Sequence, residues 1–206
     1  MKRNMLKTLL VACTLLVTGA LQGCFPLVAV GVGAGALSIA DRRTTGAQID
    51  DEAIEEKASS RFREQFGSAH YQVNVTSYNR RVLLTGQAAT EETKNKLAEI
   101  TKNVPNVVSV VNEVVVAGTS SFGSRSNDGL ITSNVKARFL TNSGGQFAPN
   151  HVKVTTENNV VYLMGLVTSA EGEAAAEVAR NSSGVEKVVK VFEYIDKAPE
   201  PGTAAK

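Results

Sequence analysis

The chain has 206 residues, of which 43% are hydrophobic and 5% aromatic, and its formal net charge is +2. A chain of this length has room for small domains with apolar cores of their own. A charge so close to zero, without a basic stripe interleaved with aromatic residues, argues against a nucleic-acid-binding protein.

The first 23 residues have the layout of an export signal. Three basic residues precede an apolar stretch over residues 8–17, and small residues follow it. The apolar stretch is too short to span a bilayer, which takes about 20 residues. We therefore predict that residues 1–23 are a lipoprotein signal peptide that is removed. The mature chain then keeps 19 basic and 20 acidic residues and is about neutral.

Cys24 is predicted to be a lipid attachment point. The residues Leu21 to Cys24 resemble the bacterial lipobox, in which a peptidase cuts before a cysteine that carries diacylglycerol. Cys13 also fits this pattern, but it would leave an apolar region shorter than the usual 7 to 15 residues, and we reject it. The resemblance implies a covalent diacylglycerol and an N-acyl group on Cys24, which together make a stable anchor. No disulfide can then form within the mature monomer.

Residues 24–46 are predicted to be the lipidated N-terminus and a tether. Phe25 follows the cysteine, and a residue that is not acidic here resembles the enterobacterial sorting pattern for the outer membrane. Residues 31–36, GVGAGA, match the dinucleotide-binding pattern G-x-G-x-x-G/A. Because no βαβ unit follows them, we interpret this segment as part of the tether.

The rest of the chain contains two copies of one unit. The stretch VNVT at residues 73–76 precedes Gly86 by the same spacing at which VKVT, residues 152–155, precedes Gly165. Upstream, four positions of the first copy match four of the second: Asp51, Ile54, Ala58 and Phe62 match Asp128, Ile131, Val135 and Phe139. We predict domains at residues 47–117 and 128–196, a Gly/Ser linker at residues 118–127 and a disordered tail at residues 197–206.

Within each copy the hydrophobic period changes in the same order. Apolar residues first recur every four residues, which predicts a helix, and then alternate or form short runs, which predicts strands. Asn79-Arg80 and Asn158-Asn159 lie between the first two strands and suit tight hairpin turns. Thr90 and Thr168, each followed by acidic residues, predict the start of a second helix. The fold class is therefore α+β, with each unit α-β-β-α-β and a three-stranded mixed sheet packed by two helices.

The hairpin, the central Gly86 and Gly165, and the third strand from Gly184 to Lys190 resemble the BON domain, named for bacterial outer-membrane and nodulation proteins. With the lipobox, the chain is similar to the dual-BON outer-membrane lipoproteins of Gram-negative envelopes, which are linked to cell division and envelope stress. The resemblance implies a lipid anchor in the outer membrane, at its periplasmic face. It also implies that the second domain binds anionic phospholipid.

The first helix of the second domain has an unusual outer face. At about 100° per residue, Leu130, Ala137 and Leu140 lie opposite the core stripe, with Lys136 and Arg138 flanking them. The first domain has polar or small residues at the matching positions: Ala53, Ser59, Ser60 and Arg63. The predicted phospholipid-binding residues are Leu130, Lys136, Ala137, Arg138 and Leu140.

No catalytic or metal site is predicted. His70 and His151 lie beside strand starts without the converging ligands that a zinc site needs, and no nucleophile constellation is present. We expect a protein that is not an enzyme and has no cofactor besides the lipid on Cys24. The leading hypothesis is an envelope lipoprotein that binds an anionic phospholipid membrane, at division sites among others. The alternative is a scaffold for outer-membrane assembly proteins.

Overall fold

The computed structural model describes residues 41–67, 70–118 and 121–197. The predictions for the signal peptide, for Cys24, for most of the tether and for nearly all of the tail fall outside these residues. Among the described residues, no helix is both long enough and apolar enough to cross a membrane.

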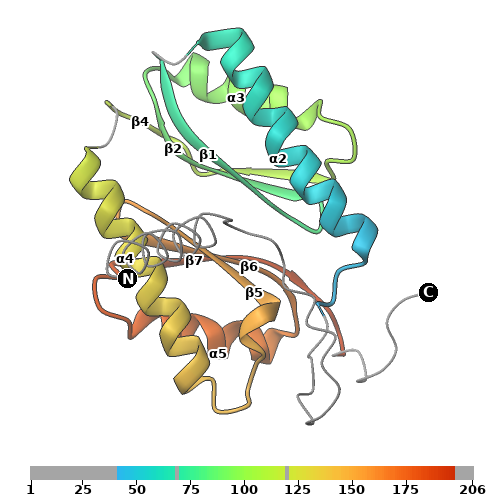
Figure 1. Ribbon diagram of the computed structural model, residues 1–206, viewed down its shortest axis with the longest axis vertical. Coiled ribbons are helices and arrows are strands. Elements are labelled where there is room, and N and C mark those ends of the chain that lie inside the picture. Colours follow the sequence, from blue (N-terminus) through green and yellow to red (C-terminus); the bar gives the residue numbers. More distant parts are fainter. Residues whose placement is uncertain (1–40, 68–69, 119–120, 198–206) are drawn as a thin grey trace, which may run out of the picture. The chain divides into compact units, whose positions relative to one another are not determined.

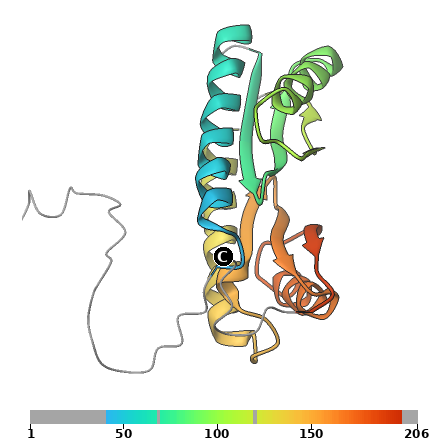
Figure 2. The ribbon, with the colours of Figure 1, turned by 90° about the vertical axis from the view of Figure 1, so that its right-hand side faces the viewer.

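The first domain runs from α2 to β4 (Figure 1). Its elements are α2 (Thr45–Phe66), β1 (Tyr71–Tyr78), β2 (Arg81–Ala88), α3 (Glu91–Lys102), β3 (Ser109–Asn112) and β4 (Val115–Val116). The central strand β2 pairs antiparallel with β1 and parallel with both β3 and β4. The third strand is thus present in two short pieces. Figure 2 shows α2 running along this sheet.

The second domain runs from α4 to β7. Its elements are α4 (Phe122–Asn142), the 3-10 helix η1 (Pro149–His151), β5 (Val152–Glu157), β6 (Val160–Val167), α5 (Ser169–Arg180) and β7 (Lys187–Tyr194). The central strand β6 pairs antiparallel with β5 and parallel with β7. The prediction of an α+β fold with two α-β-β-α-β units is confirmed.

One boundary differs from the sequence prediction. Residues 118–127 were expected to be a linker, but α4 begins at Phe122 and includes residues 122–127. Ser121 explains this start, because its side chain accepts a hydrogen bond from the backbone N–H of Ser124 at 3.2 Å. Serine is a preferred residue at this capping position. The Gly/Ser-rich composition of residues 118–127 predicted a linker, although residues 122–127 form the first turns of α4.

A buried carboxylate on each first helix holds the hairpin turn of its own domain. Both residues of each turn, 79–80 and 158–159, have positive φ, as the two-residue turn requires. The carboxylate of Asp128 accepts the two backbone N–H groups of turn 158–159, each at 2.9 Å. Asp51 accepts those of turn 79–80 at 2.8 and 2.7 Å. The aspartates that matched between the repeats thus fix α2 and α4 to their sheets.

The matching glycines allow two strands to approach closely. A Cβ atom on Gly86 would lie 2.1 Å from the carbonyl oxygen of Gln72, and one on Gly165 would lie 2.4 Å from that of His151. No larger residue fits at either position without moving the neighbouring strand. This explains why the same glycine marks β2 and β6.

Each sheet is buried on both faces. Alternate residues of β2 and β6, such as Leu84 and Leu163, face a cluster formed with the helices of their own domain. The residues between them, such as Leu83 and Met164, face a third cluster that draws on both domains. Its buried members are Tyr78, Leu83, Tyr162, Met164 and Val191. The two domains therefore contact each other through the sheet faces that carry no helix.

Polar contacts surround this shared cluster. The buried carboxylate of Glu157 accepts hydrogen bonds from the side-chain amides of Asn74 at 3.1 Å and Gln87 at 2.7 Å. Burial raises the pKa of Glu157 above its ordinary value. Two further pairs cross between the domains: Lys153 with Glu55 at 2.8 Å, and Asn79 with Glu193 at 2.9 Å.

The carboxylate of Asp128 should contribute measurably to stability. Replacing Asp128 with Ala removes the acceptor for two turn amides, and we expect the free energy of unfolding to fall by about 1–3 kcal/mol. Urea denaturation followed by circular dichroism measures this change. Asp196→Ala, which alters an exposed aspartate, serves as the control and should leave the free energy within about 0.5 kcal/mol. Equal effects of the two substitutions would contradict the assigned role.

Candidate membrane-binding site

The outer face of α4 is open to solvent. Leu130 is 65% exposed and Leu140 is 75% exposed, and Ala137 between them is exposed as well. The opposite face of the helix packs into the core through Ile131, Val135 and Phe139. No described part of the chain covers the two leucines. The structure thus places the three predicted apolar residues on one free face.

The charges around this face are almost all positive. The helix carries three basic residues, Arg125, Lys136 and Arg138, and one acidic residue, Asp128. Asp128 is buried and bound to the hairpin turn, so it does not neutralise the surface. Within the described chain, none of the three basic residues forms an ion pair with an acidic side chain. The leucines are therefore flanked by available cations.

Arg138 differs from its counterpart in the first domain. Arg61, at the matching position of α2, donates a hydrogen bond to the carbonyl oxygen of Asn103 at 2.8 Å. The Nε atom of Arg138 is buried, and it has no hydrogen-bond partner among the described residues. Arg138 therefore does not make the contact that Arg61 makes in the first domain.

The corresponding face of α2 has the opposite character. Helix α2 carries six acidic and three basic residues, and several of them are already paired on its surface. Arg63 lies 3.3 Å from Glu56, and Ser60 donates to Glu64 at 3.1 Å. Such a face repels anionic surfaces and offers few apolar groups. The two domains thus have the same fold, but the outer face of the first helix is acidic in one and apolar and basic in the other.

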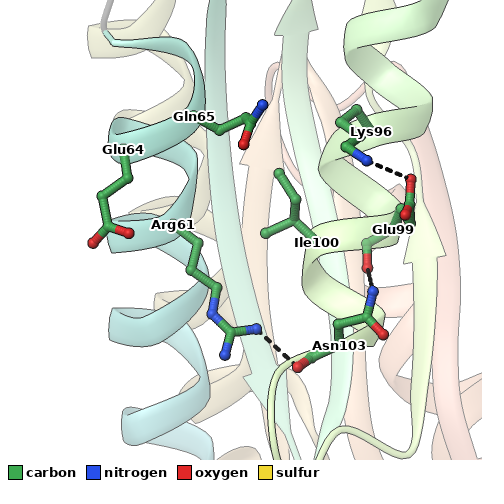
Figure 3. A pocket seen from close by; sticks show the side chains of 7 residues that line it. All are labelled: Arg61, Glu64, Gln65, Lys96, Glu99, Ile100 and Asn103. Carbon is green, nitrogen blue, oxygen red and sulfur yellow. Dashed lines mark hydrogen bonds and ion pairs between the residues drawn. The ribbon is translucent and has the colours of Figure 1, made fainter.

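A polar groove lies between α2 and α3 of the first domain (Figure 3). It has a volume of about 330 Å³ and is lined by Arg61, Glu64, Gln65, Lys96, Glu99, Ile100 and Asn103. Its cations are engaged, because Arg61 binds Asn103 and Lys96 lies 3.0 Å from Glu99. Nothing in its lining resembles a nucleophile with an activating base.

The described residues contain no group of three or more His, Cys, Asp or Glu that could hold a metal ion. His70 is exposed just before β1, and His151 is buried at the start of β5. Each histidine lies just before the first strand of its own domain, as the sequence indicated, but the two positions do not match: Gln72 is the counterpart of His151.

A contact that the sequence did not reveal ties the N-terminal arm to the second domain. The guanidinium group of Arg42 forms two hydrogen bonds with the carboxylate of Glu171, at 2.7 and 2.8 Å, and a third with the carbonyl oxygen of Leu166 at 2.9 Å. The next residue, Arg43, binds Asp51 of the first domain at 2.8 Å. Only the role of Glu171 in starting α5 was predictable, because that role is local.

A comparison with protein families identifies both domains. The family described as "BON domain" matches residues 50–118 and again residues 127–196, which is more than half of the chain. The chain belongs to the BON family.

Curated proteins of similar sequence include an outer-membrane lipoprotein. Outer membrane lipoprotein DolP of Haemophilus influenzae is 42% identical over 178 residues, covering 85% of this chain and 91% of that protein. The 21 kDa hemolysin of Actinobacillus pleuropneumoniae is 36% identical over 156 residues, covering 75% and 79%. Osmotically-inducible protein Y of Escherichia coli is 28% identical over 144 residues, covering 68% and 70%.

These findings confirm the predicted BON lipoprotein and its place at the outer membrane. None of the three relatives is named as an enzyme. The lipid on Cys24 and the five predicted phospholipid-binding residues remain predictions.

If the leucines of α4 are free surface residues, acidic replacements should not disturb the fold. We expect the double variant Leu130→Glu/Leu140→Glu to change the free energy of unfolding by less than about 1 kcal/mol, because both side chains are exposed. Ile131→Ala, on the buried face of the same helix, should lower it by about 2–5 kcal/mol. Urea denaturation of the three proteins tests this contrast, and strong destabilisation by the double variant would show that the face is covered.

Proposed function

We propose that this protein is a non-enzymatic lipoprotein that binds anionic phospholipid through α4 of its second BON domain and thereby supports envelope integrity, including at division sites. One observation carries the proposal: two exposed leucines lie on α4 among cations that no acidic side chain of the described chain neutralises. Leucines can enter the boundary of the acyl chains while basic side chains stay among the headgroups. The phospholipid-binding residues are Leu130, Lys136, Ala137, Arg138 and Leu140.

The magnitudes support a weak site that works with an anchor. Burying two leucines contributes about 3–6 kcal/mol at most, and each nearby basic residue adds about 1 kcal/mol. Binding of this strength is marginal for a free domain. A lipid on Cys24 holds the domain at a high effective concentration near the bilayer, so a weak site is sufficient to orient it.

The alternative is a surface for an outer-membrane assembly protein. The same exposed leucines favour it, because exposed apolar patches also mark protein interfaces. The excess of cations around them favours the membrane instead, since an anionic bilayer surface attracts basic side chains whatever their arrangement.

Vesicle flotation tests the lipid site. A soluble chain that begins at Asp41 should float with vesicles containing phosphatidylglycerol and stay behind with purely zwitterionic vesicles. Leu130→Glu/Leu140→Glu should lower the bound fraction at least about tenfold, because the loss of 1.4 kcal/mol is already a factor of ten. The measurement is the protein recovered with the vesicles at matched lipid concentration.

The matched control is Ile49→Glu/Val108→Glu. These two side chains, on the first domain, are 63% and 71% exposed, so the control makes the same chemical change outside α4. It should float as well as the unaltered chain. Equal flotation of both double variants would refute the α4 site, and a folded α4 variant that binds lipid but loses a protein partner would favour the scaffold.

The lipid anchor is tested by the mass of the full-length protein purified from membranes. We expect residues 1–23 to be absent and acyl groups to be present on Cys24. Cys24→Ala should abolish the acyl mass and release the protein from the membrane fraction. A mature protein that retains Met1 would contradict this prediction.

A further inference from the structure

The side chain of Glu157 lies where the two domains meet, at the end of β5. It is only 8% exposed, and it contacts β1 and β2 of the first domain. The first domain has Tyr78 at the matching position, and Tyr78 packs into the apolar cluster between the sheets. The second domain thus presents a carboxylate where the first presents an aromatic ring.

Neutral groups hold this carboxylate. Asn74 of β1 and Gln87 of β2 donate hydrogen bonds from their side-chain amides to its two oxygens, at 3.1 and 2.7 Å. Within the described chain, no Lys or Arg forms an ion pair with Glu157. Moving a charged carboxylate out of water is costly when no cation compensates for it. The charged form of Glu157 therefore opposes the contact that buries it.

Other carboxylates at the contact between the domains have cationic partners. Glu55 pairs with Lys153 at 2.8 Å, and Glu171 pairs with Arg42 at 2.7 Å. A neighbouring cation favours the charged form of a carboxylate. Protonation therefore weakens these two ion pairs, whereas at Glu157 it removes a buried charge.

The charged groups that face Glu157 lie on α4, and a tyrosine faces it from β6. Burial is the largest influence and raises the pKa of Glu157, while the amide hydrogen bonds lower it. On α4, Asp128 raises this pKa further and Arg125 lowers it. On β6, burial and the nearby Glu113 raise the pKa of Tyr162 to about 12, so its hydroxyl group stays neutral. The first domain adds the two neutral amides.

Protonated Glu157 keeps its hydrogen bonds in the closed contact. A protonated carboxyl group donates one hydrogen bond and still accepts at its other oxygen. A side-chain amide has a carbonyl oxygen as well as an NH2 group, so Gln87 or Asn74 can accept the new O–H after its amide group turns over. The neutral form is therefore both uncharged and hydrogen-bonded.

We propose that Glu157 is an acid-responsive joint between the two domains: protonation of its carboxylate tightens the contact with Asn74 and Gln87, and ionisation loosens it. We call this contact the Glu157 joint. Because α4 belongs to the second domain, loosening the joint frees α4 to change its orientation relative to the first domain. The joint concerns the contact between the domains and does not depend on lipid binding.

The unaltered chain provides the first test. Residues 41–206, which contain both domains, are labelled with 13C at the side-chain carboxyl carbons of Glu, and their chemical shifts are followed by NMR as the pH is lowered. The signal of Glu157 is identified by its absence from Glu157→Gln. Its titration midpoint should lie above the ordinary pKa of glutamate. A midpoint at or below the ordinary value would overturn the joint.

The second test compares thermal stability at two pH values. Glu157→Gln is neutral at every pH and imitates the protonated form. At about pH 7.5 its Tm should exceed that of the unaltered chain by about 2 °C or more. At about pH 4 the two Tm values should agree, because the stability that protonated Glu157 contributes is fully present below the ordinary pKa and is lost as the pH rises through the raised pKa.

Glu64→Gln is the matched control, because it makes the same chemical change at an exposed carboxylate on α2. Its Tm should stay within about 1 °C of that of the unaltered chain at both pH values. The two histidines are present in all three proteins, so their titration cancels in each comparison.

The third test measures opening of the contact itself. Residues 41–206 contain neither of the two cysteines of the chain, so Asn95→Cys and Ala170→Cys can carry a pair of nitroxide labels. These exposed positions lie on α3 and α5, the helices on the outer sides of the two sheets. Pulsed electron paramagnetic resonance records their distance in urea below the unfolding transition. The fraction of long distances should fall at least about twofold from pH 7.5 to pH 4, and should be low at both when Glu157→Gln is also present.

The outcomes distinguish a joint from a local effect. A Tm difference between Glu157→Gln and the unaltered chain that is the same at both pH values would overturn the joint. A pH-dependent Tm difference with unchanged distances would assign the effect of Glu157 to the second domain alone and would also overturn it. Vesicle flotation is a separate measurement, so either result leaves the proposed lipid binding standing.

Discussion

The contact between the two sheets is the constraint on which the rest of the structure depends. Tyr78 and Leu83 of the first domain form one buried cluster with Tyr162, Met164 and Val191 of the second. Each sheet buries one face in this cluster. Both helices of each domain therefore pack on the other face of their own sheet. Each first helix is left with one side in the core and one side in solvent. The outer face of α4 is exposed because the sheets cover each other and leave the helices on the outside.

The fold itself does not require leucines on that outer face. The first domain folds in the same way with Ala53 and Arg63 at the positions of Leu130 and Leu140. Exposed leucines bring no packing energy to a monomer, so their presence on only one of two equivalent helices points to binding and not to stability. The repeat thus supplies an internal comparison, in which α2 is the same helix with a mostly polar outer face.

The parts of the fold that depend on nearby residues were predictable. The helix start at Thr168, the left-handed turn at residues 158–159 and the buried stripe of α4 each follow from residues a few positions apart. The outer face of α4 was predictable for the same reason. The partner of Arg42 is 129 positions away, and the cluster between the sheets joins strands from separate domains, so no local pattern indicated either. The start of α4 was missed because a serine cap is indistinguishable by composition from a flexible linker.

Two carboxylates at the contacts with the second domain respond to acid in opposite ways. Arg42 lowers the pKa of Glu171 to about 2, so its contribution to stability is present above the ordinary value for glutamate and lost only as the pH falls towards 2. Burial raises the pKa of Glu157, whose charged form therefore opposes the domain contact, although the amides of Gln87 and Asn74 offset part of that cost. The stability that protonated Glu157 contributes is fully present below the ordinary pKa of glutamate. It is lost as the pH rises through the raised pKa of Glu157. Mild acidification thus favours the contact at Glu157 at a pH where the ion pair between Arg42 and Glu171 is still charged.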